Sequence, residues 1–216
     1  MWRKPLPQQV DTKDRLLEAA ERLFAAEGLS RTSLRAITCE AGVNVAAVHY
    51  HFGSKNDLLI ELLRRRIAPV NEERIARLRA IEAAAGDGPL PLDALVRAFV
   101  EPAFRLRSTI SGQEQLSRLF GRLYAEPEEI LESTVHEIFE ESSRRFRAAF
   151  LRAVPALTPT ILDLRYHFLV GLVVHTLVGR VETIHPAAIE LLESELVDHV
   201  VAFASAGMRA PAEVGQ

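Results

Sequence analysis

The sequence predicts an all-α protein with a small N-terminal three-helix domain, which carries a helix-turn-helix, and a larger C-terminal helical domain. Apolar residues recur at helical spacing along most of the chain. No Asn-Gly hairpin signal and no run of alternating residues points to strands. Apolar residues make up 48% of the 216 residues, which is enough for a sizeable core.

The first helix follows a polar, proline-containing tail over residues 1–10. It is expected to begin at Asp11 or Thr12, because both side chains suit an N-cap. Leucine, alanine and phenylalanine then recur every three or four residues and form one apolar face. Gly28 ends this helix, because glycine readily adopts the backbone conformation of a helix stop.

Two short helices come next. Thr32 or Ser33 is the expected N-cap of the first, whose inner side ends at Ala41. Gly42 supplies a tight turn, and residues 44–51 form the second. Two short helices joined by a brief turn that contains glycine are typical of a helix-turn-helix. The alternative is an ordinary helical hairpin in an all-α core.

A longer helix begins at the capping-box-like pattern from Ser54 to Asp57, in which an aspartate replaces the usual glutamate. Pro69 removes a backbone donor within this helix, so we expect a kink or a break there. The segment from Gly86 to Pro91 is rich in glycine and proline and is predicted to be a loop.

The pattern beyond this loop stays helical. Further helices are expected at Leu92 to about Arg107 with a kink at Pro102, Gln113 to Tyr124, Pro127 to before Pro155, Pro159 (capped by Thr158) to about Val181, and Pro186 to Gly207. The total is about nine helices. We expect a flexible tail over 1–10, a helix-turn-helix domain over 11–66 and a second domain over 67–216.

Composition excludes several classes of protein. Cys39 is the single cysteine, which excludes an intramolecular disulfide framework and a Cys-rich zinc site and fits the reducing cytosol. The longest apolar run, Phe168 to Val178, is broken by Gly171 and His175 and is too short to span a bilayer. We therefore expect a cytoplasmic protein without a membrane partner.

Charge is distributed unevenly along the chain, although the net charge is only −3. Residues 1–66 carry 11 Lys/Arg and 8 Asp/Glu, a net of +3. The remainder carries 15 Lys/Arg and 21 Asp/Glu, a net of −6. Weak basicity confined to the N-terminal part is compatible with phosphate contacts there.

Residues 41–55 carry the chemistry that suits DNA, and they read A-G-V-N-V-A-A-V-H-Y-H-F-G-S-K. A helix fits the major groove, and its first turn reaches base edges. We expect Asn44 to meet an adenine edge or a phosphate, and Val45 and Ala46 to meet a thymine methyl. The expected contacts to the DNA backbone are His49, Tyr50, His51, Lys55, Arg35, and Thr32 or Ser33. The expected structural anchors are Val43, Val48 and Phe52.

These motifs, in this order, resemble the TetR family of bacterial transcriptional regulators. The matching segments are Leu16 to Gly28, Thr32 to Ile37, Ala41 to Val43, Tyr50 to Phe52, Ser54-Lys55 and Leu58-Leu59. The resemblance implies a homodimer on a palindromic double-stranded DNA operator, with repression as the common outcome. It also implies a C-terminal domain that binds a small-molecule effector and dimerises through its last two helices.

Two positions depart from the family pattern. Ala46-Ala47 stands where Gly-Thr is frequent, and His49 stands where an aromatic phosphate contact is usual. The resemblance therefore does not imply the operator sequence. Within the family, residues 42–55 and 204–210 resemble the PsrA-type branch, whose members respond to long-chain fatty acids. That likeness implies a fatty acid or acyl-CoA as the effector.

The central phenylalanines admit two interpretations, which are core packing and a cavity for an apolar ligand between helices. The candidate ligand-binding residues are Phe99, Phe104, Phe120, Tyr124, Phe139, His167, Gly171 and His175. For the two histidines, the alternative is a buried, hydrogen-bonded imidazole or an interface residue. Four arginines, which are solvated by default, could meet an anionic headgroup: Arg105, Arg107, Arg118 and Arg122.

The candidate dimer interface lies on the last two helices. Its expected members are Leu172, Val173, Leu177, Leu192, Leu196, Val200 and Phe203. Glu132, His136 and Glu140 share one helical face, which is interpreted as solvated rather than as a metal site. No phosphate loop, nucleophile elbow or ligand pair points to catalysis, so no enzyme activity, cofactor or metal is expected.

The sequence therefore predicts a ligand-responsive DNA-binding regulator, which a small apolar or acyl-chain ligand releases from its operator. The alternative is a helical ligand carrier or protein-interaction module without DNA binding. An enzyme that uses the C-terminal cavity is a third reading, and it would require a bound metal or a perturbed acid–base pair.

Overall fold

The computed structural model describes residues 11–109, 119, 121, 128–178 and 193–212, without the side chains of 106–109, 128–137, 178 and 193. Within these residues there are eight helices and no strands, so the all-α prediction is confirmed. The helices are α1 (Thr12–Glu27), α2 (Leu34–Ala41), α3 (Val45–His51), α4 (Lys55–Ala85), α5 (Leu92–Thr109), α7 (Glu128–Ala153), α8 (Pro159–Val178) and α10 (Glu193–Arg209).

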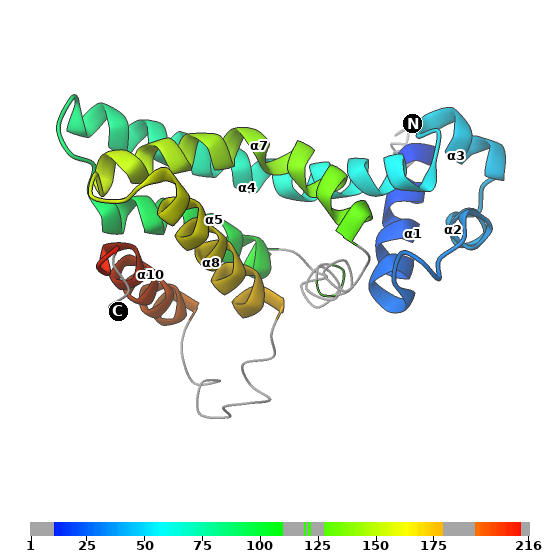
Figure 1. Ribbon diagram of the computed structural model, residues 1–216. Coiled ribbons are helices and arrows are strands. Elements are labelled where there is room, and N and C mark those ends of the chain that lie inside the picture. The colour runs from blue at the N-terminus through cyan, green and yellow to red at the C-terminus, as the bar shows by residue number, and fades with distance from the viewer. Residues whose placement is uncertain (1–10, 110–118, 120, 122–127, 179–192, 213–216) are drawn as a thin grey trace, which may run out of the picture.

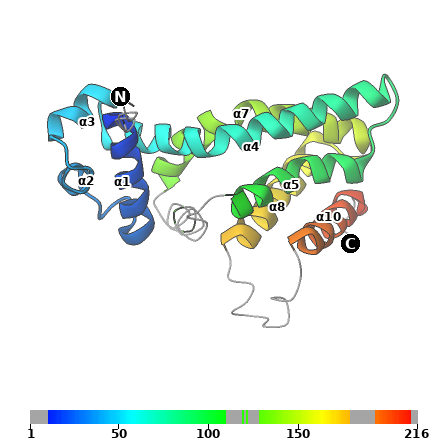
Figure 2. The same cartoon turned by 180° about the vertical axis from the view of Figure 1, so that it is seen from behind.

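The long helix α4 connects two parts of the molecule (Figure 1). At its N-terminal end, α1, α2 and α3 pack together as a small lobe, which we call the N-terminal lobe. Along the rest of α4 lie α5 and α7, with α8 and α10 beyond them, and we call this part the C-terminal body. The reverse view in Figure 2 shows the lobe and α10 well apart.

Side-chain caps start the helices where the sequence predicts them. Each capping oxygen accepts a hydrogen bond from a backbone N–H two or three residues later, which satisfies an otherwise unpaired donor of the first turn. The capping residues are Asp11, Ser33, Asn44, Ser54 and Thr158. At Ser54 the hydroxyl also donates to the carboxylate of Asp57 over 2.6 Å, which closes the cap from both sides.

Pro69 does not break α4, which runs without interruption from Lys55 to Ala85. Of the predicted kink or break, the break is therefore wrong, and the kink stays a prediction. Pro69 is exposed, so water can reach the carbonyl of Arg65, which loses its intrahelical donor. Ile67 and Val70 are buried on either side and hold the helix in the core.

One helix end differs from the sequence prediction. α10 continues two residues past Gly207 and ends at Arg209, whose side chain pairs with Asp93 at 2.8 Å. The predicted ends near Val181 and Pro186 lie outside the described residues. So does most of the predicted 113–124 helix, of which only residues 119 and 121 are described.

Two hydrophobic clusters make up the core, and they meet on α4. The first fills the N-terminal lobe and includes Phe24, Val48 and, at the boundary, Ile67. The second fills the C-terminal body and begins at Val70. Leu119 belongs to the first cluster although it comes from the C-terminal half of the sequence. The lobe is thus completed by a residue distant from it in the chain.

Candidate nucleic-acid interface

The turn between α2 and α3 is fixed by Gly42 and Arg15. Gly42 has φ +62°, a left-handed conformation that favours glycine. The backbone N–H of Val43 donates to the carbonyl of Thr38 over 2.9 Å. One guanidinium nitrogen of Arg15 on α1 donates to the carbonyls of Ala41 and Gly42. Any side chain at position 42 would collide with this nitrogen at 2.9 Å, so α1 holds the turn directly.

Helix α3 is anchored on one side only. Val48 is fully buried in the core of the lobe, and the half-buried Val43 and Phe52 pack against the same cluster. The ammonium of Lys13 lies 5.8 Å from the centroid of the Phe52 ring. These three residues lie where the sequence predicts structural anchors, and the helix therefore presents its remaining face outward.

The outward face of α3 and its cap carries the residues predicted to contact DNA. Asn44, Ala46, His49 and Tyr50 are exposed, and Val45 and His51 are half-buried. The Tyr50 side chain is 85% exposed, the largest value among the exposed large hydrophobic residues. Its ring meets the His51 ring edge-on at a centroid distance of 5.0 Å, and most of its surface stays available to a partner.

His49 has one of its ring nitrogens in use. Its Nδ1 lies 2.9 Å from the carbonyl of Gly53, which can only accept, so Nδ1 carries the proton. Nε2 then points away as an acceptor and becomes a donor on protonation. This bond closes the C-terminal end of α3, where the N–H groups of Phe52 and Gly53 also bond to helix carbonyls.

Thr32 and Lys55, both predicted to contact the DNA backbone, have structural partners within the lobe. Thr32 is 1% exposed, and its hydroxyl donates to the carbonyl of Gly28 over 2.8 Å. The ammonium of Lys55 donates to the carbonyls of Leu29 at 2.9 Å and Thr32 at 3.1 Å. Both residues hold the α1–α2 connection, and only one donor of Lys55 is left for a phosphate.

Ser33 and Arg35 remain accessible at the start of α2. Ser33 caps the helix as an acceptor, so its hydroxyl proton is available to an outside oxygen. Arg35 is exposed, and no polar partner of its guanidinium occurs among the described residues. A positive helix end beside an uncommitted guanidinium suits an anion such as a phosphate.

Three ion pairs join α1 to α4. Lys13 pairs with Glu61 at 2.6 Å, Arg65 with Asp14 at 2.5 Å, and Arg66 with Glu21. In the last pair the guanidinium grips both carboxylate oxygens, and Glu21 is 6% exposed. The hydrogen bond from Lys13 is the largest factor that lowers the pKa of Glu61. The lobe is therefore fastened to α4 and must follow its movement.

The aromatic residues of the C-terminal body form a filled core. The Phe99 ring meets Phe146 at a centroid distance of 5.2 Å and Tyr166 at 5.4 Å. Phe150 lies 6.1 Å from Phe146 and 6.4 Å from Tyr166. Phe104 is fully buried in the same cluster. Of the predicted ligand-binding residues, Phe99 and Phe104 are thus core residues of this conformation.

The other predicted ligand-binding residues are dispersed. Phe139 packs on the core of the N-terminal lobe, away from the Phe99 cluster. His167 and His175 are exposed on α8, so the buried-imidazole interpretation is wrong for both. Gly171 is half-buried, with open space where a Cβ would lie. Phe120 and Tyr124 lie outside the described residues.

The predicted dimer residues fall into buried, partly buried and exposed groups. Val173 and Val200 are buried in the chain's own core, and Leu172, Leu177 and Leu196 pack partly against it. Phe203 is 72% exposed. Sequence reasoning missed Leu164 and Phe168 on α8, which are 50% and 60% exposed. Apolar side chains at i and i+4 on an otherwise polar face were the available signal. Leu192 is not described.

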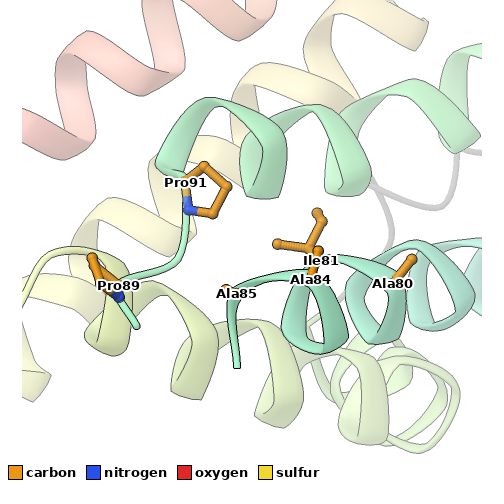
Figure 3. A pocket seen from close by; sticks show the side chains of 6 residues that line it. All are labelled: Ala80, Ile81, Ala84, Ala85, Pro89 and Pro91. Atoms are coloured by element: carbon orange, nitrogen blue, oxygen red, sulfur yellow. The ribbon is translucent and has the colours of Figure 1, made fainter. Parts of the chain in front are cut away.

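Two pockets lie on the surface along α4. One is an apolar pocket of about 470 Å³ at the far end of α4, lined by Ala80, Ile81, Ala84, Ala85, Pro89 and Pro91 (Figure 3). The other, of about 420 Å³, lies between α4 and α7 beside Asn71, which donates to the carbonyl of Ile138 over 2.9 Å. Neither is lined by the predicted ligand-binding residues.

Across the described ranges, no three His, Cys, Asp or Glu side chains gather as a metal site. Among those same helices, none joins the length and the apolar character that crossing a bilayer requires. Arg105, one candidate for a headgroup contact, pairs with Glu101 at 2.7 Å, while the side chains of Arg107, Arg118 and Arg122 are not described.

Family comparisons cover most of the chain. Residues 16–62 match the family described as bacterial regulatory proteins, tetR family. Residues 97–207 match the family described as Tetracyclin repressor-like, C-terminal domain.

Curated relatives resemble this chain over limited segments. The HTH-type transcriptional repressor BepR of Brucella suis is 31% identical over 98 residues, which cover 45% of this chain and 44% of that protein. The HTH-type transcriptional regulator AcrR of Shigella flexneri is 40% identical over 62 residues, or 29% of each chain. The matches span less than half the length of these relatives.

Solved structures match almost the whole length. The fatty acid degradation regulator FadR of Bacillus halodurans superposes with a TM-score of 0.67 over 96% of this chain and 99% of that chain, at 15% identity. FadR of Bacillus subtilis, in complex with stearoyl-CoA, gives a TM-score of 0.67 over 89% and 97% of the two chains, also at 15% identity. At this identity the likeness establishes a shared fold.

Proposed function

Because the chain belongs to the TetR family of bacterial regulatory proteins, we propose that it is a DNA-binding transcriptional regulator that represses from a palindromic operator. The observation that carries this proposal is the outward face of α3, where Tyr50 is 85% exposed beside Asn44, Ala46 and His49. A short helix anchored by one buried valine and held by Arg15 at the preceding turn is shaped to enter a major groove.

The exposed residues divide by chemistry into two groups. Asn44, Val45 and Ala46 at the first turn of α3 meet base edges. Tyr50, Ser33 and Arg35 bond to phosphates, together with His49 when its Nε2 is protonated and His51 at the end of the helix. Lys55 contributes mainly by holding the α1–α2 connection, and Thr32 only by doing so.

Two copies of the chain are needed to read a palindrome, and α8 and α10 offer a surface for that contact. Leu164, Phe168 and Phe203 are the large apolar side chains exposed on these helices. A face of this kind fits a twofold contact with a second copy, in which each chain buries the same residues. Recognition helices then lie about 34–36 Å apart, one turn of DNA.

The effector in this proposal is a small molecule with an apolar or acyl chain. The apolar interior around Phe99 and the fold shared with an acyl-CoA-bound regulator support this chemistry. A ligand that enters the C-terminal body must displace packed rings and shift the helices around them. Since α4 is fastened to α1 by three ion pairs, such a shift turns the lobes and changes the spacing of the two α3 helices.

Binding of the full-length protein to the DNA upstream of its own gene, measured against salt, tests the proposal. Arg35→Ala is expected to weaken binding and to reduce the salt slope by about 1.8 per dimer, because one phosphate contact is lost in each half-site. Tyr50→Ala is expected to weaken binding about tenfold at one salt concentration. Arg79→Ala is the matched control, since Arg79 is an exposed arginine of the C-terminal body.

The result decides between this proposal and a helical carrier or interaction module. No shift of any upstream fragment at low salt, in protein that is folded and dimeric, contradicts DNA binding. Equal losses for Arg35→Ala and Arg79→Ala would place the contact elsewhere on the molecule.

A further inference from the structure

A buried arginine lies at the centre of the C-terminal body. Arg74 on α4 is 4% exposed. Its Nε donates to the backbone carbonyl of Phe99 over 2.8 Å, and its guanidinium carbon lies 4.0 Å from the centroid of the Phe99 ring. These contacts come from one residue of α5, and they engage only one of the five N–H donors of the side chain.

Arg74 has no acidic partner among the described residues, and its neighbour on the same helix shows how unusual this is. Arg77, one turn later, pairs with Glu73 at 2.7 Å and with Glu101 at 3.1 Å. Burial is the largest factor that lowers the pKa of Arg74, to about 10, so the side chain is still charged at neutral pH. A buried charge without a counter-charge is costly, and proteins normally pair it.

The surroundings of Arg74 are apolar and aromatic. Phe99 lies against the guanidinium and also contacts the rings of Phe146 and Tyr166. The phenol of Tyr166 lies close enough to Arg74 to interact with its charge, and its hydroxyl donates to Ser143 over 3.1 Å. A cation next to an apolar aromatic cluster is complementary to a molecule with one compact anionic group on an apolar body.

We infer that Arg74 is the anion-binding residue of the effector site and that the effector carries a carboxylate, or a comparably compact anion, on an apolar chain. This inference rests on the proposed function and specifies the ligand class. The guanidinium is too deeply buried to receive a nucleotide headgroup, so the anion is a terminal group that enters with the chain. Pairing with Arg74 supplies the counter-charge that no described residue supplies to this guanidinium.

The position of Arg74 also explains how binding would reach the lobe. An anion that pairs with the guanidinium competes with the carbonyl of Phe99 and separates α4 from α5 at this point. The same α4 carries Glu61, Arg65 and Arg66, which hold α1. The effector therefore favours a different α4 position by its differential affinity for the two arrangements.

The test uses the full-length dimer and three probes that share a C16 chain: palmitate, 1-hexadecanol and palmitoyl-CoA. Four proteins are compared, namely the unaltered protein, Arg74→Met, Arg74→Lys and the control Arg79→Met. Release from operator DNA and the melting temperature are measured for each. DNA binding without probe is measured first, because its absence would contradict the proposed regulator itself rather than the role of Arg74.

Three results are expected. Palmitate, but not 1-hexadecanol, releases the unaltered protein and raises its melting temperature. Arg74→Met needs about tenfold or more palmitate for release than Arg79→Met does, because a charge-assisted contact is lost, and Arg74→Lys lies between. Without ligand, Arg74→Met melts no lower than the unaltered protein, since it removes an unpaired buried charge.

Other results overturn the inference. Equal palmitate sensitivity of Arg74→Met and Arg79→Met would show that the anion is bound elsewhere. Release by 1-hexadecanol as effective as release by palmitate would show that no anion is recognised. A response to palmitoyl-CoA alone would replace the compact anion with a large headgroup. A marked fall in the melting temperature of Arg74→Met would make Arg74 a structural residue.

Discussion

The N-terminal lobe and the C-terminal body treat their charged side chains differently. In the lobe, three cationic side chains are paired. Arg66 pairs with Glu21, Lys13 pairs with Glu61, and Lys55 donates to two backbone carbonyls. In the body, Arg74 is buried without an acidic partner among the described residues. The lobe cations named above are therefore paired within the protein, whereas Arg74 of the body is a buried cation that no described acidic residue pairs with.

This difference indicates which part of the molecule can respond to a ligand. In the lobe, ion pairs to α4 and hydrogen bonds to the α1–α2 connection fix how α3 is presented. A body that contains an uncompensated charge has an interaction to gain, and only a ligand with differential affinity for two arrangements can shift them. Under the proposed function, the DNA-binding lobe and the ligand-binding body therefore need opposite internal chemistry. The continuous helix α4 joins them.

The largest expected effect comes from emptying each core separately. Phe24→Ala in the lobe and Phe146→Ala in the body remove fully buried rings, and each should cost about 3–5 kcal/mol of stability. If the two cores are distinct, Phe24→Ala loses DNA binding while dimers persist. Analytical ultracentrifugation and thermal unfolding check this. Loss of dimers in Phe24→Ala would mean that lobe and body unfold together.

The ion pair between Glu21 and Arg66 comes next. Glu21→Gln leaves Arg66 partly buried without its carboxylate and should cost about 1–3 kcal/mol. Asp14→Asn removes the more exposed partner of Arg65 and should cost at most about 1 kcal/mol. Chemical denaturation measures both. Equal costs would contradict the expectation that the less exposed pair, Glu21 with Arg66, contributes more to the attachment of α1 to α4.

Lys55 separates structure from recognition within the lobe. Lys55→Met removes two charge-assisted bonds to carbonyls and should cost about 1–3 kcal/mol of stability. Tyr50→Phe should leave stability unchanged and weaken DNA binding only, because the ring is exposed and its hydroxyl has no polar partner in the described chain. Paired melting and binding curves check this, and a stable Lys55→Met protein would restore the phosphate role to that lysine.

The smallest expected effect is on folding stability at acid pH. The hydrogen bond from Lys13 lowers the pKa of Glu61, and that from Arg77 lowers the pKa of Glu101. Each carboxylate stabilises the fold above its ordinary pKa near 4.5, and this stability is lost as pH falls through the lowered value. The contributions should be about 1 kcal/mol or less, since both pairs are partly exposed.

Denaturation of Glu61→Gln and Glu101→Gln across pH 3–6 tests these contributions, within the range where carboxylates titrate. Each variant should show a flatter decline of stability below about pH 4.5 than the unaltered protein. A decline as steep as that of the unaltered protein would mean that the exchanged carboxylate contributes nothing.

Sequence reasoning predicts the elements of the lobe well, because its signals are local. Caps such as Ser33, Asn44 and Ser54 act on the next two or three residues, so spacing alone identifies them. Pro69 shows the limit of local reasoning, since its tolerance depends on exposure and on buried neighbours.

The roles of Lys55 and Arg74 depend on contacts between residues that are distant in the chain, which sequence reasoning does not supply. Lys55 bonds to carbonyls 23 and 26 residues away, and Arg74 to one 25 residues away. Nothing in the pattern around Arg74 distinguishes it from Arg77 or Arg79, which face ion pairs or solvent. Burial of a charged residue is decided by which helix packs on it, and a single sequence does not carry that information.

Leu119 limits how freely this protein can be recombined with its relatives. It is fully buried in the core of the N-terminal lobe, and Ile138 and Phe139 pack on the same cluster. In a hybrid regulator joined at residue 66, the N-terminal lobe of a relative would have to pack against these three side chains. Engineers who wish to exchange operator specificity should therefore redesign the α3 surface within this chain, or transplant residues 119, 138 and 139 together with the head.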